Sequence, residues 1–195
     1  MNPEESESSQ WAGDQPTSLA TDLVNQNIVK EGSHVLDLGC GFGRNSNWLA
    51  SKGAIVDAIN INQTELEEAK KRASFNNVDV KYVNANAGEL PFVDSSFDVL
   101  LDAGCTHMCD RVTQEKAVKE AFRVIKPGGY LQYFGFSKEH PSFKTNPLSS
   151  QFRNLEDIQA QYGEFFEIVG TPKRKEWMNK TDRHVGLEIL MKRKI

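Results

Sequence analysis

The sequence predicts an α/β fold built around a doubly wound, mostly parallel sheet of seven strands, in which the last strand is antiparallel. Two observations support this class: short apolar segments alternate with amphipathic helical ones, and the first apolar segment ends in a glycine-rich turn. The length of 195 residues suits one domain with one sizeable core. Residues 1–10 are acidic, rich in serine and without apolar periodicity, so we expect a disordered tail before a single domain over 11–195.

The predicted elements alternate regularly along the chain. A helix is expected from Pro16 to Val29, because proline suits a first helical position and Leu19 and Leu23 share an apolar face. Strands are expected at 34–38, 54–60, 80–84, 97–103 and 130–136, with helices from the glycine turn to Ser51, over 64–73 and over 114–124. Two further strands, at 164–169 and 185–192, are separated by a polar stretch without a convincing helix and should pair antiparallel at the sheet edge.

The overall charge and composition exclude several classes of partner. Twenty-three Lys and Arg residues against 27 Asp and Glu residues give a net charge of −4, which offers no electrostatic reason to expect nucleic acid or an anionic membrane. No apolar run approaches the roughly 18 residues of a membrane span, and three cysteines argue against a disulfide framework. We expect a cytoplasmic protein, monomeric or homodimeric, with no membrane or nucleic-acid partner.

The most informative motif is the glycine-rich segment that follows the first strand, DLGCGFGRN from Asp37 to Asn45. Glycine at every second position lets the backbone turn sharply and approach a ligand closely. The segment is not the dinucleotide fingerprint G-x-G-x-x-G, because Arg44 stands where the third glycine would be. An acid two residues before the first glycine instead favours the methionine portion of S-adenosylmethionine. A nicotinamide cofactor is the lesser alternative.

Several motifs in order resemble the class I S-adenosylmethionine-dependent methyltransferases: VLDLGCGFGRNS, LPFVDSSFDVLL and RVIKPGGYL. The resemblance implies a Rossmann-like sheet, S-adenosylmethionine as cofactor, and transfer of its methyl group to a small molecule. More narrowly, GFGRNSNWLASKGAIVDAIN, the early WAGDQP, DAGCTHM and the closing RHVGLEILMKRK resemble the small tellurite-resistance and thiopurine-type methyltransferases. That likeness favours a thiol or chalcogen nucleophile over oxygen, nitrogen or carbon. A catalytically silent binding protein of the same fold is the alternative.

The resemblance also implies roles for individual residues around the cofactor. Asp37 would organise the loop and bind the amino group of the methionine, with Gly39 and Gly41 giving backbone contacts. Two further loop residues and two residues at the end of the fourth strand would also lie near the methionine part of the cofactor; they are Cys40, Arg44, Asp102 and Ala103.

The ribose and adenine positions depart from the family pattern, because amides stand where acids are expected. Asn60, followed by Ile61, would face the ribose hydroxyls, and Asn86, followed by Ala87, would face the adenine. An amide oxygen still accepts a hydrogen bond, but without charge assistance, so we expect the two amides to weaken cofactor binding. Asn60→Asp and Asn86→Asp should then tighten it. Asp57 is a poor substitute acid, because alternation along the strand places it on the opposite face.

Methyl transfer from a sulfonium requires alignment more than acid–base catalysis. His107, after the fourth strand, and His140, after the fifth, are the candidate catalytic residues, since ligands of open parallel sheets bind at the carboxyl ends of the strands. A structural role for His107, bonded to backbone, is slightly favoured over a catalytic one. Cys105-x-His107-x-Cys109 does not have zinc-site spacing, so no metal is expected. Residues 141–152 are expected to cap the substrate side.

Overall fold

A computed structural model describes residues 15–145, 151–179 and 182–195. The predicted tail and the WAGD residues that follow it lie outside these ranges, as does part of the predicted cap over 141–152. The strands are β1 (His34–Leu38), β2 (Ile55–Asn60), β3 (Val80–Asn84), β4 (Phe97–Ala103), β5 (Ile125–Phe136), β6 (Phe166–Ile168), β7 (Lys173–Asn179) and β8 (Asp182–Arg193). The helices are α2 (Ser18–Asn25), α3 (Arg44–Ser51), α4 (Gln63–Phe75), α5 (Arg111–Val124) and α6 (Leu155–Tyr162), with short 3₁₀ turns η1 (Thr106–Met108) and η2 (Pro141–Lys144).

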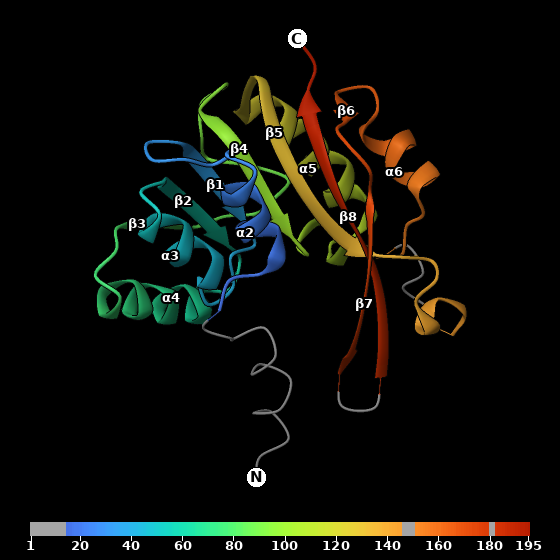
Figure 1. The fold of residues 1–195 in the computed structure, drawn as a ribbon, viewed down its shortest axis with the longest axis horizontal. Coiled ribbons are helices and arrows are strands. Elements are labelled where there is room, and N and C mark those ends of the chain that lie inside the picture. The colour runs from blue at the N-terminus through green and yellow to red at the C-terminus, as the bar shows by residue number, and fades with distance from the viewer. Residues whose placement is uncertain (1–14, 146–150, 180–181) are drawn as a thin grey trace.

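The strands form one sheet in the order β3-β2-β1-β4-β5-β8-β6, and β7 pairs with β8 off this path (Figure 1). The first five strands are parallel, and β8 runs antiparallel to β5, β6 and β7. This confirms the predicted mostly parallel α/β sheet with an antiparallel last strand. The seven strands along the path correspond to the seven predicted ones, and β7 is an additional strand.

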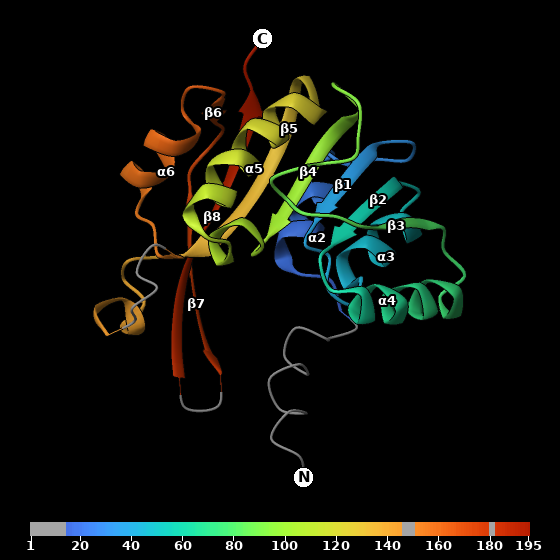
Figure 2. The same ribbon diagram turned by 180° about the vertical axis from the view of Figure 1, so that it is seen from behind.

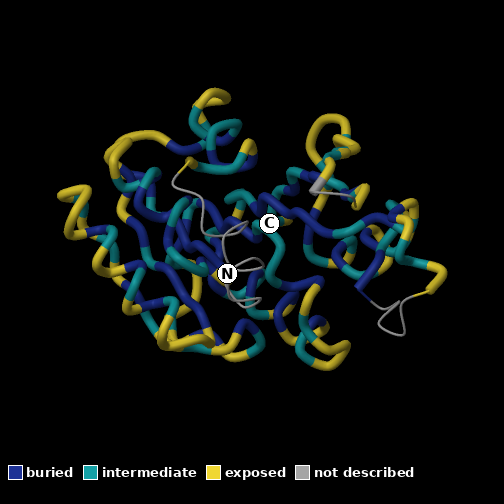
Figure 3. The backbone as a smooth tube through the Cα atoms, turned by 90° about the horizontal axis from the view of Figure 1, so that it is seen from below, coloured by how far each residue is buried: buried dark blue, intermediate teal, exposed yellow. Residues whose placement is uncertain are grey.

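Helices cover both faces of the sheet, as Figures 1 and 2 show from opposite sides. On one face, α2 and α3 pack against alternate residues of β1, β2 and β4, among them Val35, Val56 and Val99. On the other, α5 and α6 pack against the intervening residues, among them Leu36 and Leu100. The buried segments gather in the centre and the exposed turns lie outside (Figure 3). Burial on both faces explains why these strands are almost continuously apolar.

Two elements were not predicted, and each has a physical reason. The β7 sequence KRKEWMN lacks the alternation of a half-buried strand because it lies in a hairpin with β8, where its charged residues form ion pairs. The α6 sequence LEDIQAQY is short and buries only Ile158 and Tyr162, so its apolar periodicity is weak. None of the helices in residues 15–145, 151–179 and 182–195 is long and apolar enough to cross a membrane.

Candidate functional site

The loop that joins β1 to α3 contains three glycines in left-handed backbone conformations. Gly39, Gly41 and Gly43 have φ angles of +70°, +54° and +77°, which residues with a Cβ rarely adopt. A Cβ on Gly39 would lie 2.5 Å from the Cβ and Sγ atoms of Cys105, so the loop is in close contact with the turn after β4. The predicted glycine loop therefore exists, and it presents backbone rather than side chains to a ligand.

Asp37 lies beneath this loop and is almost completely buried. Ser46, in α3, donates a hydrogen bond from Oγ to its Oδ2 at 2.5 Å. Burial raises the pKa of Asp37 to about 6, although the hydrogen bond from Ser46 and the positive charge of Arg44 act in the opposite direction. An ammonium group beside this carboxylate would stabilise its ionised form. The site thus suits the amino group of a methionine moiety.

A cavity of about 170 Å³ lies beside the loop at the carboxyl ends of β1, β2 and β4. Ile61 is 71% exposed and offers this cavity an apolar surface on which a flat ring can pack. The lining includes five of the predicted cofactor residues: Gly39, Asn60, Ile61, Asn86 and Ala87. The structure therefore brings the residues predicted for ribose and adenine together next to the glycine loop, and their chemistry fits an adenosyl group.

The two amides in this cavity are held differently. Asn60 is buried at the end of β2, and its Nδ2 donates to Oε2 of Glu65 at 2.6 Å. Among the residues that the structure describes, the Oδ1 of Asn60 accepts only a long hydrogen bond, 3.4 Å from the backbone N–H of Asn62. Asn86 is exposed, and its Oδ1 accepts from the backbone N–H of Gly88 at 2.8 Å. Asn86 thus shapes its own turn, whereas Asn60 is tied to a neighbouring carboxylate.

Two other acid or thiol side chains point away from the cavity. The Cys40 side chain packs in a small core cluster with Ala58 and Leu66, and burial raises the pKa of its thiol. Only the backbone of Cys40 lies along the loop. Asp57 forms an ion pair with Lys81 at 2.9 Å between neighbouring strands. Asp57 therefore has a structural role, linking β2 to β3.

The turn after β4 is held by Asp102, whose carboxylate accepts the backbone N–H groups of Cys105 at 2.8 Å and Thr106 at 3.2 Å. Asp102 thus caps the turn instead of extending toward a ligand, and burial raises its pKa. A hydrogen bond between the thiols of Cys105 and Cys109 raises the pKa of the first and lowers that of the second. Within the described ranges, no group of three or more His, Cys, Asp or Glu residues is arranged to hold a metal ion.

His107 lies in a group of aromatic rings that continues this turn. Its ring is 3% exposed and meets the rings of Phe134 and Phe136 edge-on, at centroid distances of 6.1 and 4.8 Å. Neither ring nitrogen has a hydrogen-bond partner among the described residues. Burial lowers the pKa of His107 to about 4, so the imidazole is neutral at physiological pH.

His140, the second predicted catalytic residue, is committed at both ring nitrogens. Nδ1 accepts the backbone N–H of Ser142 at 3.1 Å, and Nε2 lies 3.0 Å from Nδ1 of His184. Since Nδ1 of His140 accepts, its Nε2 carries the proton and donates to His184. His184 in turn stacks on Trp177 at a centroid distance of 5.2 Å. His140 therefore fixes the start of η2 and links it to the β7–β8 hairpin.

Comparison with known proteins agrees with this geometry. Residues 36–132 match a family described as methyltransferase domain. The chain is 38% identical over 129 residues to a ubiquinone/menaquinone biosynthesis C-methyltransferase, UbiE, of Vibrio vulnificus, a match that covers 64% of this chain and 47% of the relative. It is 36% identical over 117 residues to the methyltransferase GfsG of Streptomyces halstedii, covering 58% and 41%. A solved S-adenosylmethionine-dependent methyltransferase of Methanosarcina mazei has 25% identity and a TM-score of 0.73, over 88% of this chain and 97% of that one.

The chain belongs to the class I S-adenosylmethionine-dependent methyltransferases. It spans less than half the length of the two curated relatives named above. A protein from Pyrococcus horikoshii with 15% identity has the same fold over its whole length, with a TM-score of 0.76. S-adenosylmethionine is thus the cofactor implied by the family, and the glycine loop, Asp37 and the adjoining cavity are the parts of this chain that fit it.

A second cavity of this methyltransferase, of about 360 Å³, lies at the start of α3 and the carboxyl end of β4. Arg44 and Ala103, both predicted near the methionine end, line it together with Phe134 and Trp177. Trp177 comes from the β7–β8 hairpin, which extends beyond the carboxyl ends of β4 and β5 (Figure 1). The cavity that holds Ala103 and Arg44 therefore lies next to the aromatic group around His107.

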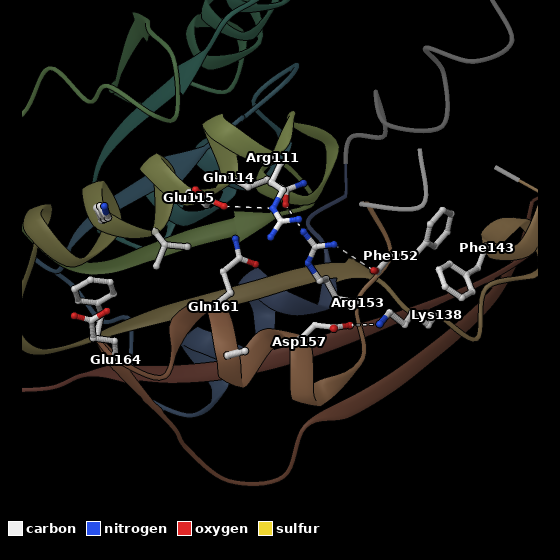
Figure 4. A pocket seen from close by; sticks show the side chains of 14 residues that line it. Arg111, Gln114, Glu115, Lys138, Phe143, Phe152, Arg153, Asp157, Gln161 and Glu164 are labelled. Atoms are coloured by element: carbon white, nitrogen blue, oxygen red, sulfur yellow. Dashed lines mark hydrogen bonds and ion pairs between the residues drawn. The ribbon is translucent and has the colours of Figure 1, made fainter. Parts of the chain in front are cut away.

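A third cavity, of about 790 Å³, lies between α5 and α6 (Figure 4). Two ion pairs line it: Lys138 pairs with Asp157 at 2.7 Å, and Arg111 with Glu115 at 3.3 Å. Arg153 contacts Gln114, whose Nε2 also bonds to the backbone of the turn that holds His107. None of the predicted cofactor residues lines this cavity, so it lies outside the cofactor site.

Three residues around the site were not predicted to belong to it. Ser46 holds the carboxylate of Asp37, Glu65 contacts Asn60, and Trp177 lines the second cavity. Sequence spacing offers a signal for one of them, because Glu65 occupies the third position of a helix whose N-cap is Asn62. Ser46 and Trp177 reach the site through tertiary packing, which a single sequence does not reveal.

Proposed function

We propose that the chain transfers the methyl group of S-adenosylmethionine to a small, largely apolar acceptor that binds beside the β7–β8 hairpin. Bound S-adenosylmethionine would supply an electrophilic methyl group, and the protein would align the nucleophile and exclude water. Asp37 would bind the amino group of the cofactor, and the 170 Å³ cavity would hold its adenosyl end. The second cavity, with Ala103 and Trp177, would receive the acceptor.

The observation that carries the acceptor proposal is the neutral, aromatic wall around His107. Phe134 and Phe136 meet the buried imidazole edge-on and Trp177 packs on these two rings, and both imidazole nitrogens lack partners among the described residues. With a pKa of about 4, His107 is a weak base at neutral pH, but it can donate or accept one hydrogen bond to orient an acceptor. His140 is occupied by His184 and Ser142.

A site without a strong base favours a nucleophile that ionises unaided. A thiol, with a pKa near ~8.5, meets this requirement and a simple alcohol does not. The resemblance to tellurite-resistance and thiopurine-type methyltransferases supports the same choice of a thiol or chalcogen. The relatives found by comparison are methyltransferases of other kinds, among them the C-methyltransferase of Vibrio vulnificus at 38% identity. An electron-rich ring carbon, as in an ionised phenol, is therefore the second candidate acceptor atom.

Two experiments test the proposal in order. Calorimetric titration with S-adenosylmethionine and S-adenosylhomocysteine should give saturable binding, and no binding at millimolar ligand would instead indicate a catalytically silent protein. Methyl-labelled cofactor should then be offered with matched panels of aromatic thiols, phenols and amines. We expect the thiols to be labelled fastest; transfer to phenol oxygen or amine nitrogen alone would refute the argument from the missing base.

A further inference from the structure

The first turn of α4 carries a carboxylate in an unusual orientation. Asn62 is the N-cap, and its Oδ1 accepts the backbone N–H groups of Thr64 at 3.0 Å and Glu65 at 3.3 Å. In a capping box, the acid at the third helical position would accept the N–H of the N-cap residue in return. Here the N–H of Asn62 points to Asn60, and the Glu65 carboxylate lies 2.6 Å from Nδ2 of Asn60. Glu65 is thus directed away from its own helix and toward the end of β2.

The same carboxylate faces the glycine loop. A Cβ built on Gly41 would lie 3.9 Å from Oε2 of Glu65. Glu65 is half-buried, and within the part of the chain that the structure describes its Oε1 has no hydrogen-bond partner. Asn60, to which it is bound, lines the 170 Å³ cavity. The Glu65 carboxylate therefore lies beside the glycine loop and next to Asn60, with Oε2 bonded to the Asn60 amide and Oε1 left to accept a hydrogen bond.

We propose that Glu65, and not the residue at the end of β2, supplies the carboxylate that binds the ribose hydroxyls of S-adenosylmethionine. This inference rests on the proposed function only in requiring that the chain binds the cofactor. The two ribose hydroxyls are donors, and a carboxylate can accept from both, whereas the amide group of Asn60 has one acceptor oxygen. Asn60 is a positioning residue, because its Nδ2 holds the Glu65 carboxylate in place.

The assignment reverses the expectation that Asn60→Asp tightens cofactor binding. In the folded chain that substitution would place a second carboxylate at hydrogen-bond distance from the first, where the two charges repel each other. Combining Asn60→Asp with Glu65→Gln would restore one carboxylate and one amide with their places exchanged. The pair therefore offers a test in which two damaging substitutions compensate each other.

The experiment is calorimetric titration of the full chain with S-adenosylhomocysteine and with its 2′-deoxyribose analogue. Glu65→Gln should weaken binding of S-adenosylhomocysteine roughly tenfold to a hundredfold, because a charge-assisted contact becomes a neutral one. It should also remove the preference of the wild type for the ribose over the deoxyribose ligand. Glu67→Gln is the matched control: it removes the same charge two residues later, where Glu67 contacts only Gln63 among the described residues, and should leave both affinities unchanged.

The outcomes separate this inference from the proposed function. If the wild type binds neither ligand, the proposed function fails and the inference fails with it. If the wild type binds and Glu65→Gln binds equally well, only the assignment of Glu65 is wrong. If Glu65→Gln weakens both ligands equally and Asn60→Asp does not rescue it, Glu65 merely supports the loop, which also overturns the assignment. Rescue in the double variant, with the ribose preference regained, supports it.

Discussion

Replacing Asp37 by asparagine should stabilise the cofactor-free protein at neutral pH and prevent it from binding S-adenosylmethionine. The carboxylate is buried beneath the glycine loop, and burial raises its pKa from an ordinary 3.8 to about 6. Below pH 3.8 the group is protonated in both the folded and the unfolded chain, so it contributes no pH-dependent free energy. As pH rises from 4 to 6, the unfolded chain ionises first, and the folded state loses stability relative to it.

The size of this effect follows from the same two values. The interval between 3.8 and about 6 corresponds to roughly 3 kcal/mol of folding free energy above pH 6. Asparagine avoids this cost but weakens the contact with Ser46, which is 2.5 Å long in the native protein, by about 1 kcal/mol. We therefore expect Asp37→Asn to raise the free energy of unfolding by about 2 kcal/mol at pH 7.5, and to have little effect or slightly lower it at pH 4.

Urea denaturation of the cofactor-free protein between pH 4 and 8, followed by circular dichroism, measures this difference directly. Ser46→Ala is the companion variant with the opposite sign, because it removes a hydrogen bond that favours the ionised form and should destabilise the protein more at pH 7.5 than at pH 4. A difference between Asp37→Asn and wild type that stays constant from pH 4 to 8 would refute the reasoning. In parallel, calorimetry should show loss of cofactor binding by Asp37→Asn at every pH.

Three further substitutions test separate parts of the site. Gly39→Ala should destabilise the fold by about 2–4 kcal/mol in urea denaturation, because its Cβ would meet the turn after β4 at a left-handed φ. Gly32→Ala is the control: its φ is also left-handed, at +78°, but no atom lies within 4 Å of the added Cβ, so it should cost only about 1 kcal/mol. Equal losses would contradict the steric argument. His107→Phe keeps a ring in the aromatic group and removes two nitrogens that have no partner among the described residues, so thermal stability should stay constant or rise while labelled-methyl turnover falls. Unchanged turnover would assign His107 a packing role. Tyr82→Phe removes the buried 2.7 Å hydrogen bond to Asn47 and should lower the free energy of unfolding by about 1–2 kcal/mol, and no loss would show that Asn47 finds another partner.

The parallel part of the fold could be predicted because its signals are local. Strands β1 to β4 are short apolar runs separated by helices or by a glycine-containing turn, and α5 ends at Val124 as predicted. Strand β5 begins at Ile125 and not at the predicted residue 130, so Pro127, Gly128 and Gly129 lie within it. The antiparallel edge was predicted from two apolar runs, and their pairing as β6 and β8 is confirmed. The hairpin strand β7 could not be predicted, because its stability comes from pairing with β8 and from ion pairs between residues far apart in sequence.

The cofactor loop could also be predicted, because repeated glycines indicate a backbone conformation that other residues rarely adopt. The acceptor side could not be predicted, because the protonation and hydrogen bonding of its histidines depend on burial. A histidine after the fourth strand can be a base, a ligand or a packing group, and it is the burial of His107, together with the positive charge of Arg153, that lowers its pKa to about 4. The same holds for His140, whose commitment to His184 joins residues 44 positions apart. Side-chain chemistry at such sites is decided by neighbours that spacing does not identify.

The Asn60 position shows why reading a motif by residue number can fail even where the motif is intact. A pattern specifies which side chain is attached at one Cα, but a ligand responds to where the charged atoms lie. Aspartate at the end of β2 and glutamate in the first turn of the next helix differ by five residues, yet the longer side chain of Glu65 brings its carboxylate within 2.6 Å of the Asn60 amide. A neutral residue at the expected position is therefore weak grounds for inferring a lost cofactor site. The stronger criterion is whether any carboxylate within side-chain reach of the glycine loop has an oxygen left to accept, and Glu65 meets it.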